Sequence, residues 1–108
     1  MAQFMKVASL SELAPGACKT VHVNGKAIAL FNVGGTVFAL DNLCLHMGGP
    51  LGDGLLEGDV VTCPWHMWEY NVRTGEQVMN PALKVATYPV QVEGGDIKVA
   101  VSSVVRGP

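Results

Sequence analysis

The sequence predicts an all-β fold in which antiparallel sheets form a sandwich-like base. Runs rich in valine, isoleucine, threonine and aromatic residues are separated by turns, for which the chain has 13 glycines and 6 prolines. No stretch shows helical periodicity beyond one turn. With 108 residues, of which 49% are apolar, the chain has the size of a single domain, residues 1–108.

The N-terminal part predicts four strands joined by short turns. Ser9–Leu13 is typical of a brief capped turn between the first two strands. Asn24-Gly25 accepts the positive φ angles of a type I′ hairpin turn, and Gly34-Gly35 reverses the chain again. The strands expected here are Phe4–Ala8, Cys18–Val23, Lys26–Val33 and Thr36–Leu40.

The C-terminal part predicts one more antiparallel hairpin. Apolar and polar residues alternate along Tyr88–Glu93 and again along Ile97–Val101, with a turn at Gly94–Asp96. This alternation predicts a hairpin with one buried face. The last residues, Val104–Pro108, are expected to be a fraying tail.

Between these β-rich ends, from about residue 42 to 83, the pattern changes to glycine, proline and paired aromatic residues. We expect this segment to form a separate lobe inserted in the β base, and a loop region of that length needs something to hold it. The lobe contains two cysteines and two histidines, namely Cys44, His46, Cys63 and His66. Thiolate and imidazole together bind zinc, iron or copper, so the residue types alone leave the metal open.

The spacing of these four residues narrows the choice of metal. A structural zinc knuckle separates its two ligands by about two to four residues, and the single residue between Cys44 and His46 fits that poorly. The spacing fits better if each segment gives one sulfur and one nitrogen to different atoms of a larger group. A cluster of two irons and two sulfides is such a group, with both thiolates on one iron and both imidazoles on the other.

Cys44-x-His46 and Cys63-x-x-His66, sixteen residues apart, resemble the Rieske iron-sulfur signature. The flanking hairpins are similar too, so the resemblance covers nearly the whole chain. It implies the Rieske fold, with a two-loop lobe that binds one 2Fe-2S cluster. Cys44 and Cys63 would then hold the inner iron, while His46 and His66 would hold the outer iron and present the electron exit. Further positions that match the family are Gly48, Leu51, Gly58, Val61, Pro64, the run Tyr70–Gly75 and Asn80-Pro81.

The resemblance also implies a reduction potential. Two ferric ions, two sulfides and two thiolates make the oxidised cluster neutral, so its potential lies above that of an all-cysteine ferredoxin. High-potential members of the family add a disulfide between the two loops, but the matching positions here are Gly49 and Trp65. They also carry a serine hydroxyl where this chain has Trp68. We therefore expect a low potential, near or below the foot of the Rieske range of about −150 to +300 mV.

The residues around the second loop point to one kind of Rieske protein. Met67, Trp68 and Tyr70 make the chain similar to the ferredoxins of bacterial aromatic-ring dioxygenases and diiron monooxygenases. This implies an electron carrier and not an enzyme, which takes electrons from a flavin-containing or other NAD(P)H-linked reductase and passes them to a terminal oxygenase. An oxygenase would itself need two more histidines for a mononuclear iron, and only His22 is left. Met47 and Met67 would form an adaptable docking patch.

Charge and hydropathy limit the partners. Seven basic and nine acidic residues provide no broad positive field, so neither nucleic acid nor a membrane surface is expected as a partner. The lobe carries a net charge of −4 and the rest of the chain +2, which indicates steering onto basic patches of partner proteins. Apolar runs fall short of the roughly 18 residues of a membrane span, and the N-terminus lacks the long apolar stretch of a signal peptide. We expect a monomer in the cytoplasm.

The chain has three cysteines, an odd number that argues against disulfides in a reducing compartment. Cys18 and His22, outside both loops, are expected to be ordinary strand residues. Two alternative functions remain open from the sequence. One is the small Rieske-like subunit of a cytoplasmic nitrite reductase, and the other is a structural zinc-binding interaction module.

Overall fold

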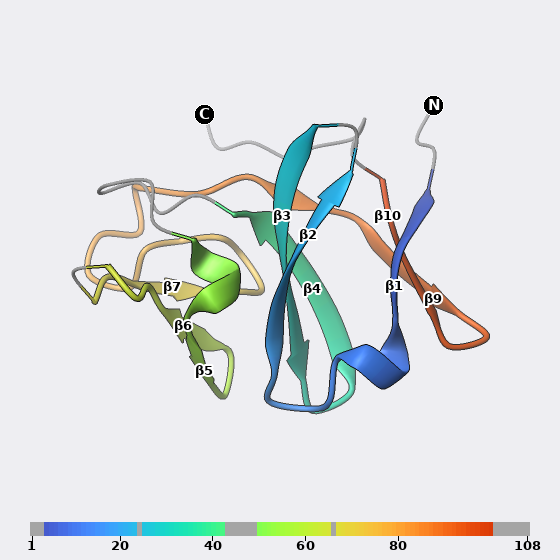
Figure 1. Ribbon diagram of the computed structural model, residues 1–108. Coiled ribbons are helices and arrows are strands. Elements are labelled where there is room, and N and C mark those ends of the chain that lie inside the picture. Colours follow the sequence, from blue (N-terminus) through green and yellow to red (C-terminus); the bar gives the residue numbers. More distant parts are fainter. Residues whose placement is uncertain (1–3, 24, 43–49, 66, 101–108) are drawn as a thin grey trace.

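The protein folds into three antiparallel sheets, as the computed structural model shows for residues 4–23, 25–42, 50–65 and 67–100 (Figure 1). The strand orders are β1-β10-β9, β2-β3-β4-β8 and β5-β6-β7. The elements are β1 (Met5–Ser9), η1 (Leu10–Glu12), β2 (Cys18–Val23), β3 (Lys26–Val33), β4 (Thr36–Asp41), η2 (Leu51–Asp53), β5 (Leu55–Glu57), β6 (Val60–Thr62), β7 (Glu69–Asn71), β8 (Thr87–Tyr88), β9 (Val90–Glu93) and β10 (Asp96–Val99). The predicted all-β fold is confirmed.

The four-stranded sheet is the middle layer of the molecule. One face packs on the sheet of β1, β10 and β9, where Ile28 and Leu30 share a buried cluster with Ile97 and Val99. The other face packs on the lobe through a second buried cluster that includes Ala29 and Phe31 of the same strand. Both faces of β3 are therefore buried, which explains its nearly continuous apolar sequence.

The predicted N-terminal hairpins are confirmed. β2 and β3 pair from Cys18↔Phe31 to Val23↔Lys26, and Gly25 has a φ of +78°. Asn24, the other residue of that turn, lies outside the described residues. Gly34 and Gly35 also have positive φ angles, as the next tight turn requires.

The brief turn predicted over Ser9–Leu13 is present as η1, but the side-chain cap expected for it is absent at Ser9. Ser9 is the last residue of β1, where it pairs with Asp96, and its side chain makes no capping hydrogen bond to η1. The amide of Leu10 instead donates to the carbonyl of Gly95 at 2.7 Å. The neighbouring hairpin thus satisfies the first amide of η1.

The strand predicted over Tyr88–Glu93 divides at Pro89. β8 pairs with β4 in the middle sheet, whereas β9 pairs with β10 in the outer sheet. Proline has no amide hydrogen for a ladder, so it suits the point where the chain changes sheets. One buried face was predicted for both strands, but this holds only for β10, because Val92 of β9 is 42% exposed. The predicted tail, residues 104–108, lies outside the described residues.

The lobe is more regular than its sequence indicates. Three strands of three residues each, β5, β6 and β7, form a small sheet in the segment expected to be mostly loop. β5 and β6 are joined by Gly58-Asp59, and Gly58 has a φ of +61°. A glycine at the first central position is typical of a type II′ hairpin turn, and this dipeptide is the signal that could have predicted the strands.

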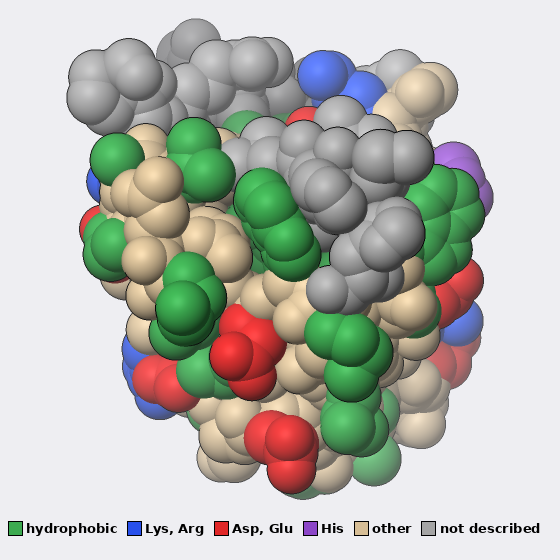
Figure 2. Space-filling view, turned by 90° about the vertical axis from the view of Figure 1, so that its left-hand side faces the viewer, with side chains coloured by type: hydrophobic (Ala, Val, Ile, Leu, Met, Phe, Trp, Pro, Cys, Tyr) green, Lys and Arg blue, Asp and Glu red, His purple; other side chains and the backbone are tan. Residues whose placement is uncertain are grey.

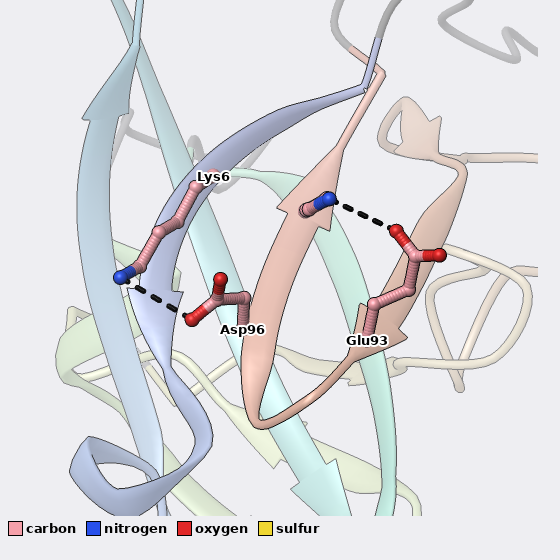
Figure 3. Close-up of polar contacts among 4 residues, drawn as sticks. Lys6, Glu93 and Asp96 are labelled. Carbon is pink, nitrogen blue, oxygen red and sulfur yellow. Dashed lines mark hydrogen bonds and ion pairs between the residues drawn. The ribbon is translucent and has the colours of Figure 1, made fainter.

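Two ion pairs lie on the surface of the outer sheet. Lys6 on β1 lies 3.3 Å from Asp96 on β10, and Lys98 lies 2.9 Å from Glu93 on β9 (Figure 3). The base therefore pairs these cations within its own sheet.

In the described ranges, no helix has the length and apolar character needed to cross a membrane.

Candidate functional site

Of the four predicted ligands, Cys63 is the one that the structure describes, while Cys44, His46 and His66 lie outside the described residues. Cys63 directly follows β6 and is completely buried. It packs in the lobe cluster that also contains Leu51, Val61 and Tyr70. Among the described residues, no group of three or more histidine, cysteine or acidic side chains is placed to hold a metal ion.

Cys63 begins the loop that joins β6 to β7. Its amide donates to the carbonyl of Trp68 at 2.7 Å, which closes the base of this loop. The amide of Trp65 donates to Sγ of Cys63 at 3.4 Å. Met67 is the non-glycine residue with a positive φ, +63°, among the described residues. The second candidate ligand segment is therefore a hairpin loop that turns its cysteine sulfur inward, onto a backbone donor.

Asn42 ties together the two chain positions that flank the first candidate ligand segment. Its Oδ1 accepts a hydrogen bond from the amide of Gly52 at 2.6 Å and another from Oγ1 of Thr20 at 3.5 Å. The bonds join the end of β4 and the start of η2 to β2. The sequence analysis missed this role of Asn42, because nothing in the local pattern separates an anchoring asparagine from a turn asparagine.

Two glycines let the segment that follows the first candidate loop pack closely against two strands. A Cβ on Gly52 would overlap Oγ1 of Thr20, and a Cβ on Gly54 would overlap the carbonyl oxygen of Thr62. Both contacts require the absence of a side chain. They bring the segment after the first candidate loop against β2 and against the strand that leads into Cys63.

Cys18 lies on β2 as predicted, with its side chain toward the lobe. Its thiol donates to the carbonyl of Gly54 at 3.1 Å. Burial, with a smaller contribution from the negative charge of Asp53, raises the pKa of this thiol. Cys18 is thus a neutral hydrogen-bond donor between base and lobe. His22, further along β2, is exposed.

Large apolar side chains are exposed around the second loop. Met67 is 69% exposed and Leu55 is 62% exposed, and Met79 from the proline-bearing third loop is 83% exposed. Figure 2, which faces the lobe, shows hydrophobic side chains spread over this surface with acidic side chains among them. Met47, the other half of the predicted methionine patch, lies outside the described residues.

Comparison with known proteins agrees with this arrangement. Residues 3–89 match the family model described as the Rieske [2Fe-2S] domain. The chain is 41% identical over 91 residues to a protein of Ralstonia sp described as the ferredoxin component of naphthalene 1,2-dioxygenase/salicylate 5-hydroxylase systems. That match covers 83% of this chain and 88% of the relative.

Two solved structures are similar over nearly their whole length. One is the ferredoxin of carbazole 1,9a-dioxygenase from Nocardioides aromaticivorans IC177, at 32% identity and a TM-score of 0.83, covering 92% of this chain and 98% of that one. The other is a chain in a complex of reduced oxygenase and oxidized ferredoxin in carbazole 1,9a-dioxygenase. Its identity is 32% and its TM-score 0.82, covering 90% of this chain and 92% of that one.

Proposed function

This chain belongs to the Rieske [2Fe-2S] domain family, and we propose that it carries single electrons to the terminal oxygenase of an aromatic-ring hydroxylating system. The relatives are named as ferredoxin components of dioxygenase systems, and one similar structure is a complex of ferredoxin with oxygenase. The chain is accordingly a carrier and not an enzyme. We further propose that residues 1–108 act as one domain.

The proposed ligands are Cys44 and Cys63 through their thiolates and His46 and His66 through their imidazoles. Bound there, a 2Fe-2S cluster supplies one-electron oxidation and reduction. The described part of the site suits such a group. Cys63 offers a sulfur that is shielded from water, and the Trp65 amide points a donor at it.

The observation that carries the proposal is the setting of Cys63. A cysteine that only filled space would not need a hairpin loop whose backbone donates to its sulfur. The packing of Leu51 and Tyr70 beside Cys63 excludes water from that side of the lobe. Low local polarity makes each nearby hydrogen bond to sulfur count more for the reduction potential.

The electron donor in this proposal is a flavin-containing or other NAD(P)H-linked reductase. A carrier between two larger proteins needs weak, fast contacts, and the net charge of −4 on residues 42–83 suits steering onto basic surfaces. We place the carrier in the cytoplasm. That compartment keeps cysteines reduced and available as ligands.

The test is a comparison of cysteine variants of the purified holoprotein. The wild type is expected to be reddish brown, to contain equal amounts of iron and sulfide, and to bleach with dithionite. Cys63→Ala should lose its iron and colour, whereas Cys18→Ala, the matched control, should keep both. His66→Cys should keep a cluster but shift its electron paramagnetic resonance signal and lower its midpoint potential, because it adds a negative charge.

A colourless wild-type protein that binds zinc would overturn the proposal, and so would full iron content in Cys63→Ala. Electron transfer from the reductase to the terminal oxygenase is tested by reconstitution. Reductase, this ferredoxin and a terminal oxygenase purified from the same organism should consume NAD(P)H and hydroxylate an aromatic substrate. Omitting the ferredoxin should abolish product formation.

A further inference from the structure

An open pocket of about 620 Å³ lies beside Cys63, which forms part of its wall. We call it the docking pocket and define it by six lining residues. Its apolar wall consists of Leu55, Pro64 and Met67, and its acidic rim consists of Asp53, Glu57 and Glu69. These residues come from η2, β5, the loop after β6 and the start of β7, so folding of the lobe assembles them.

The apolar wall is exposed at a conformational cost. Leu55 is 62% exposed and Met67 is 69% exposed, and neither side chain packs in either buried cluster. Met67 also has a φ of +63°, a conformation that costs a residue with a Cβ about 1 kcal/mol relative to glycine. An exposed methionine held in a strained turn is more easily explained by a contact with a partner than by folding.

The acidic rim has no ion-pair partner within the part of the chain that the structure describes. There the ion pairs are Lys6 with Asp96, Lys98 with Glu93 and Arg73 with Asp59. None of them involves Asp53, Glu57 or Glu69. The lobe face in Figure 2 shows acidic side chains near its centre, while the lysine and arginine side chains lie toward the edges. The pocket therefore combines an apolar wall with unneutralised negative charge.

We propose that this pocket docks the terminal oxygenase by receiving a lysine or arginine side chain from its surface. The aliphatic stem would pack against Leu55 and Met67, and the charged end would lie among the carboxylates of the rim. Because Cys63 lines the same pocket, this contact places the oxygenase next to a proposed cluster ligand. The inference rests on the proposed electron-transfer function and adds to it the residues that select the partner.

The test uses a terminal oxygenase purified from the same organism by its ability to accept electrons from this ferredoxin. The variant is the double substitution Glu57→Gln/Glu69→Gln. Its matched control is Glu12→Gln/Glu93→Gln, which removes two charges from the base, outside residues 42–83 (Figure 1). Visible spectrum and midpoint potential are measured first, so that a change in the cluster is not mistaken for a change in docking.

The rim variant should bind the oxygenase about tenfold more weakly at low salt, since each partly exposed ion pair is worth up to about 1 kcal/mol. Its affinity should also respond less to added salt. The control should change affinity less than about twofold. A carbodiimide that joins carboxylates directly to amines should cross-link Glu57 or Glu69 to a lysine of the oxygenase, and Leu55→Ser should weaken binding without changing net charge.

Equal losses in the rim variant and the control would overturn the docking pocket, as would cross-links that avoid its rim. If the rim variant loses affinity for the reductase and keeps it for the oxygenase, the proposal is wrong about the partner. If no oxygenase accepts electrons from the wild type, the proposed function itself fails. If the wild type transfers electrons and the rim variant does so equally well, only the docking pocket fails.

Discussion

The amide of Trp65 donates a hydrogen bond of 3.4 Å to Sγ of Cys63, two residues earlier in the same hairpin loop. If Cys63 is a cluster ligand, this donor stabilises the more negative, reduced state. Replacing Trp65 with proline removes the amide hydrogen. We expect a midpoint potential lower by about 20–60 mV, which corresponds to about 0.5–1.4 kcal/mol for one electron.

Trp65→Ala is the control for this prediction, because it removes the half-exposed indole and keeps the amide. Redox titration of the two holoproteins checks the outcome. An equal fall in potential for alanine and proline would assign the effect to the side chain, and the importance of the backbone donor would then be refuted.

Gly52 and Thr20 form the second relationship open to test, the close contact between η2 and β2. A Cβ on residue 52 would overlap Oγ1 of Thr20 and lie 2.9 Å from its backbone nitrogen. Since backbone cannot move aside easily, Gly52→Ala should cost about 2–3 kcal/mol. Thermal unfolding of the holoprotein measures this as a fall in Tm of roughly 4–8 °C for each kcal/mol.

Gly34→Ala is the matched control for Gly52→Ala. Gly34 has a φ of +58° but open space around its Cβ position. It should lose only the roughly 1 kcal/mol of an unfavourable backbone conformation. If both variants lose the same free energy of unfolding, the close contact between Gly52 and Thr20 does not contribute to stability.

The pKa of Cys18 predicts how stability depends on pH. Burial raises this pKa in the folded protein above its ordinary value of 9.0. The unfolded chain therefore ionises first, and the stability contributed by the neutral thiol is present below about pH 9 and is lost as pH rises beyond it. We expect the Tm of the wild type to fall more than that of Cys18→Ala between pH 7 and pH 10.

Alkylation gives an independent check on Cys18. In the holoprotein, its reaction with iodoacetamide at pH 8 should be much slower than that of a free thiol, because the thiolate reacts and the thiol does not. Rapid labelling at pH 8, or parallel pH profiles for wild type and Cys18→Ala, would contradict the assignment of Cys18 as a half-buried neutral donor.

Arg73 makes one contact with the middle sheet and one within the lobe. Its guanidinium lies 5.0 Å from the ring centre of Phe38 on β4, and its Nε lies 3.4 Å from Oδ2 of Asp59. Arg73→Ala removes both contacts and should lower Tm by about 4–8 °C, equivalent to about 1 kcal/mol. Asp59→Asn removes only the exposed ion pair and should have less than half that effect. Equal effects would show that the ring contact contributes nothing.

The parts of the fold that were predictable depend on strong local signals. The hairpin at Gly25 and the turn at Gly34-Gly35 follow from dipeptides that tolerate positive φ. The small sheet of the lobe was not predicted from the sequence, because strands of three residues are too short to show an alternating pattern. The change of sheet at Pro89 was not predictable either. The alternating pattern continues across Pro89, and tertiary packing decides that β8 joins one sheet and β9 another.

The candidate site also has a part that the sequence predicts and a part that it does not. The cysteines and histidines of the lobe were recognisable from their spacing, because a metal centre restricts which residues recur and how far apart. The docking pocket was not recognisable. Asp53, Glu57 and Glu69 look like ordinary loop acids in the sequence, and only the pairing of β5, β6 and β7 brings them around one apolar wall.

Met67 leads to a prediction in which stability and function oppose each other. Met67→Gly relieves a positive φ and should raise Tm by about 4–8 °C, while removal of an apolar wall weakens oxygenase binding. Met79→Gly is the control, since Met79 is 83% exposed, has no positive φ and lies outside the docking pocket. It should give no gain in Tm. If the two variants shift Tm alike, the turn at Met67 stores no strain. If Met67→Gly gains stability and binds the oxygenase as tightly as the wild type, the strained methionine serves no docking role.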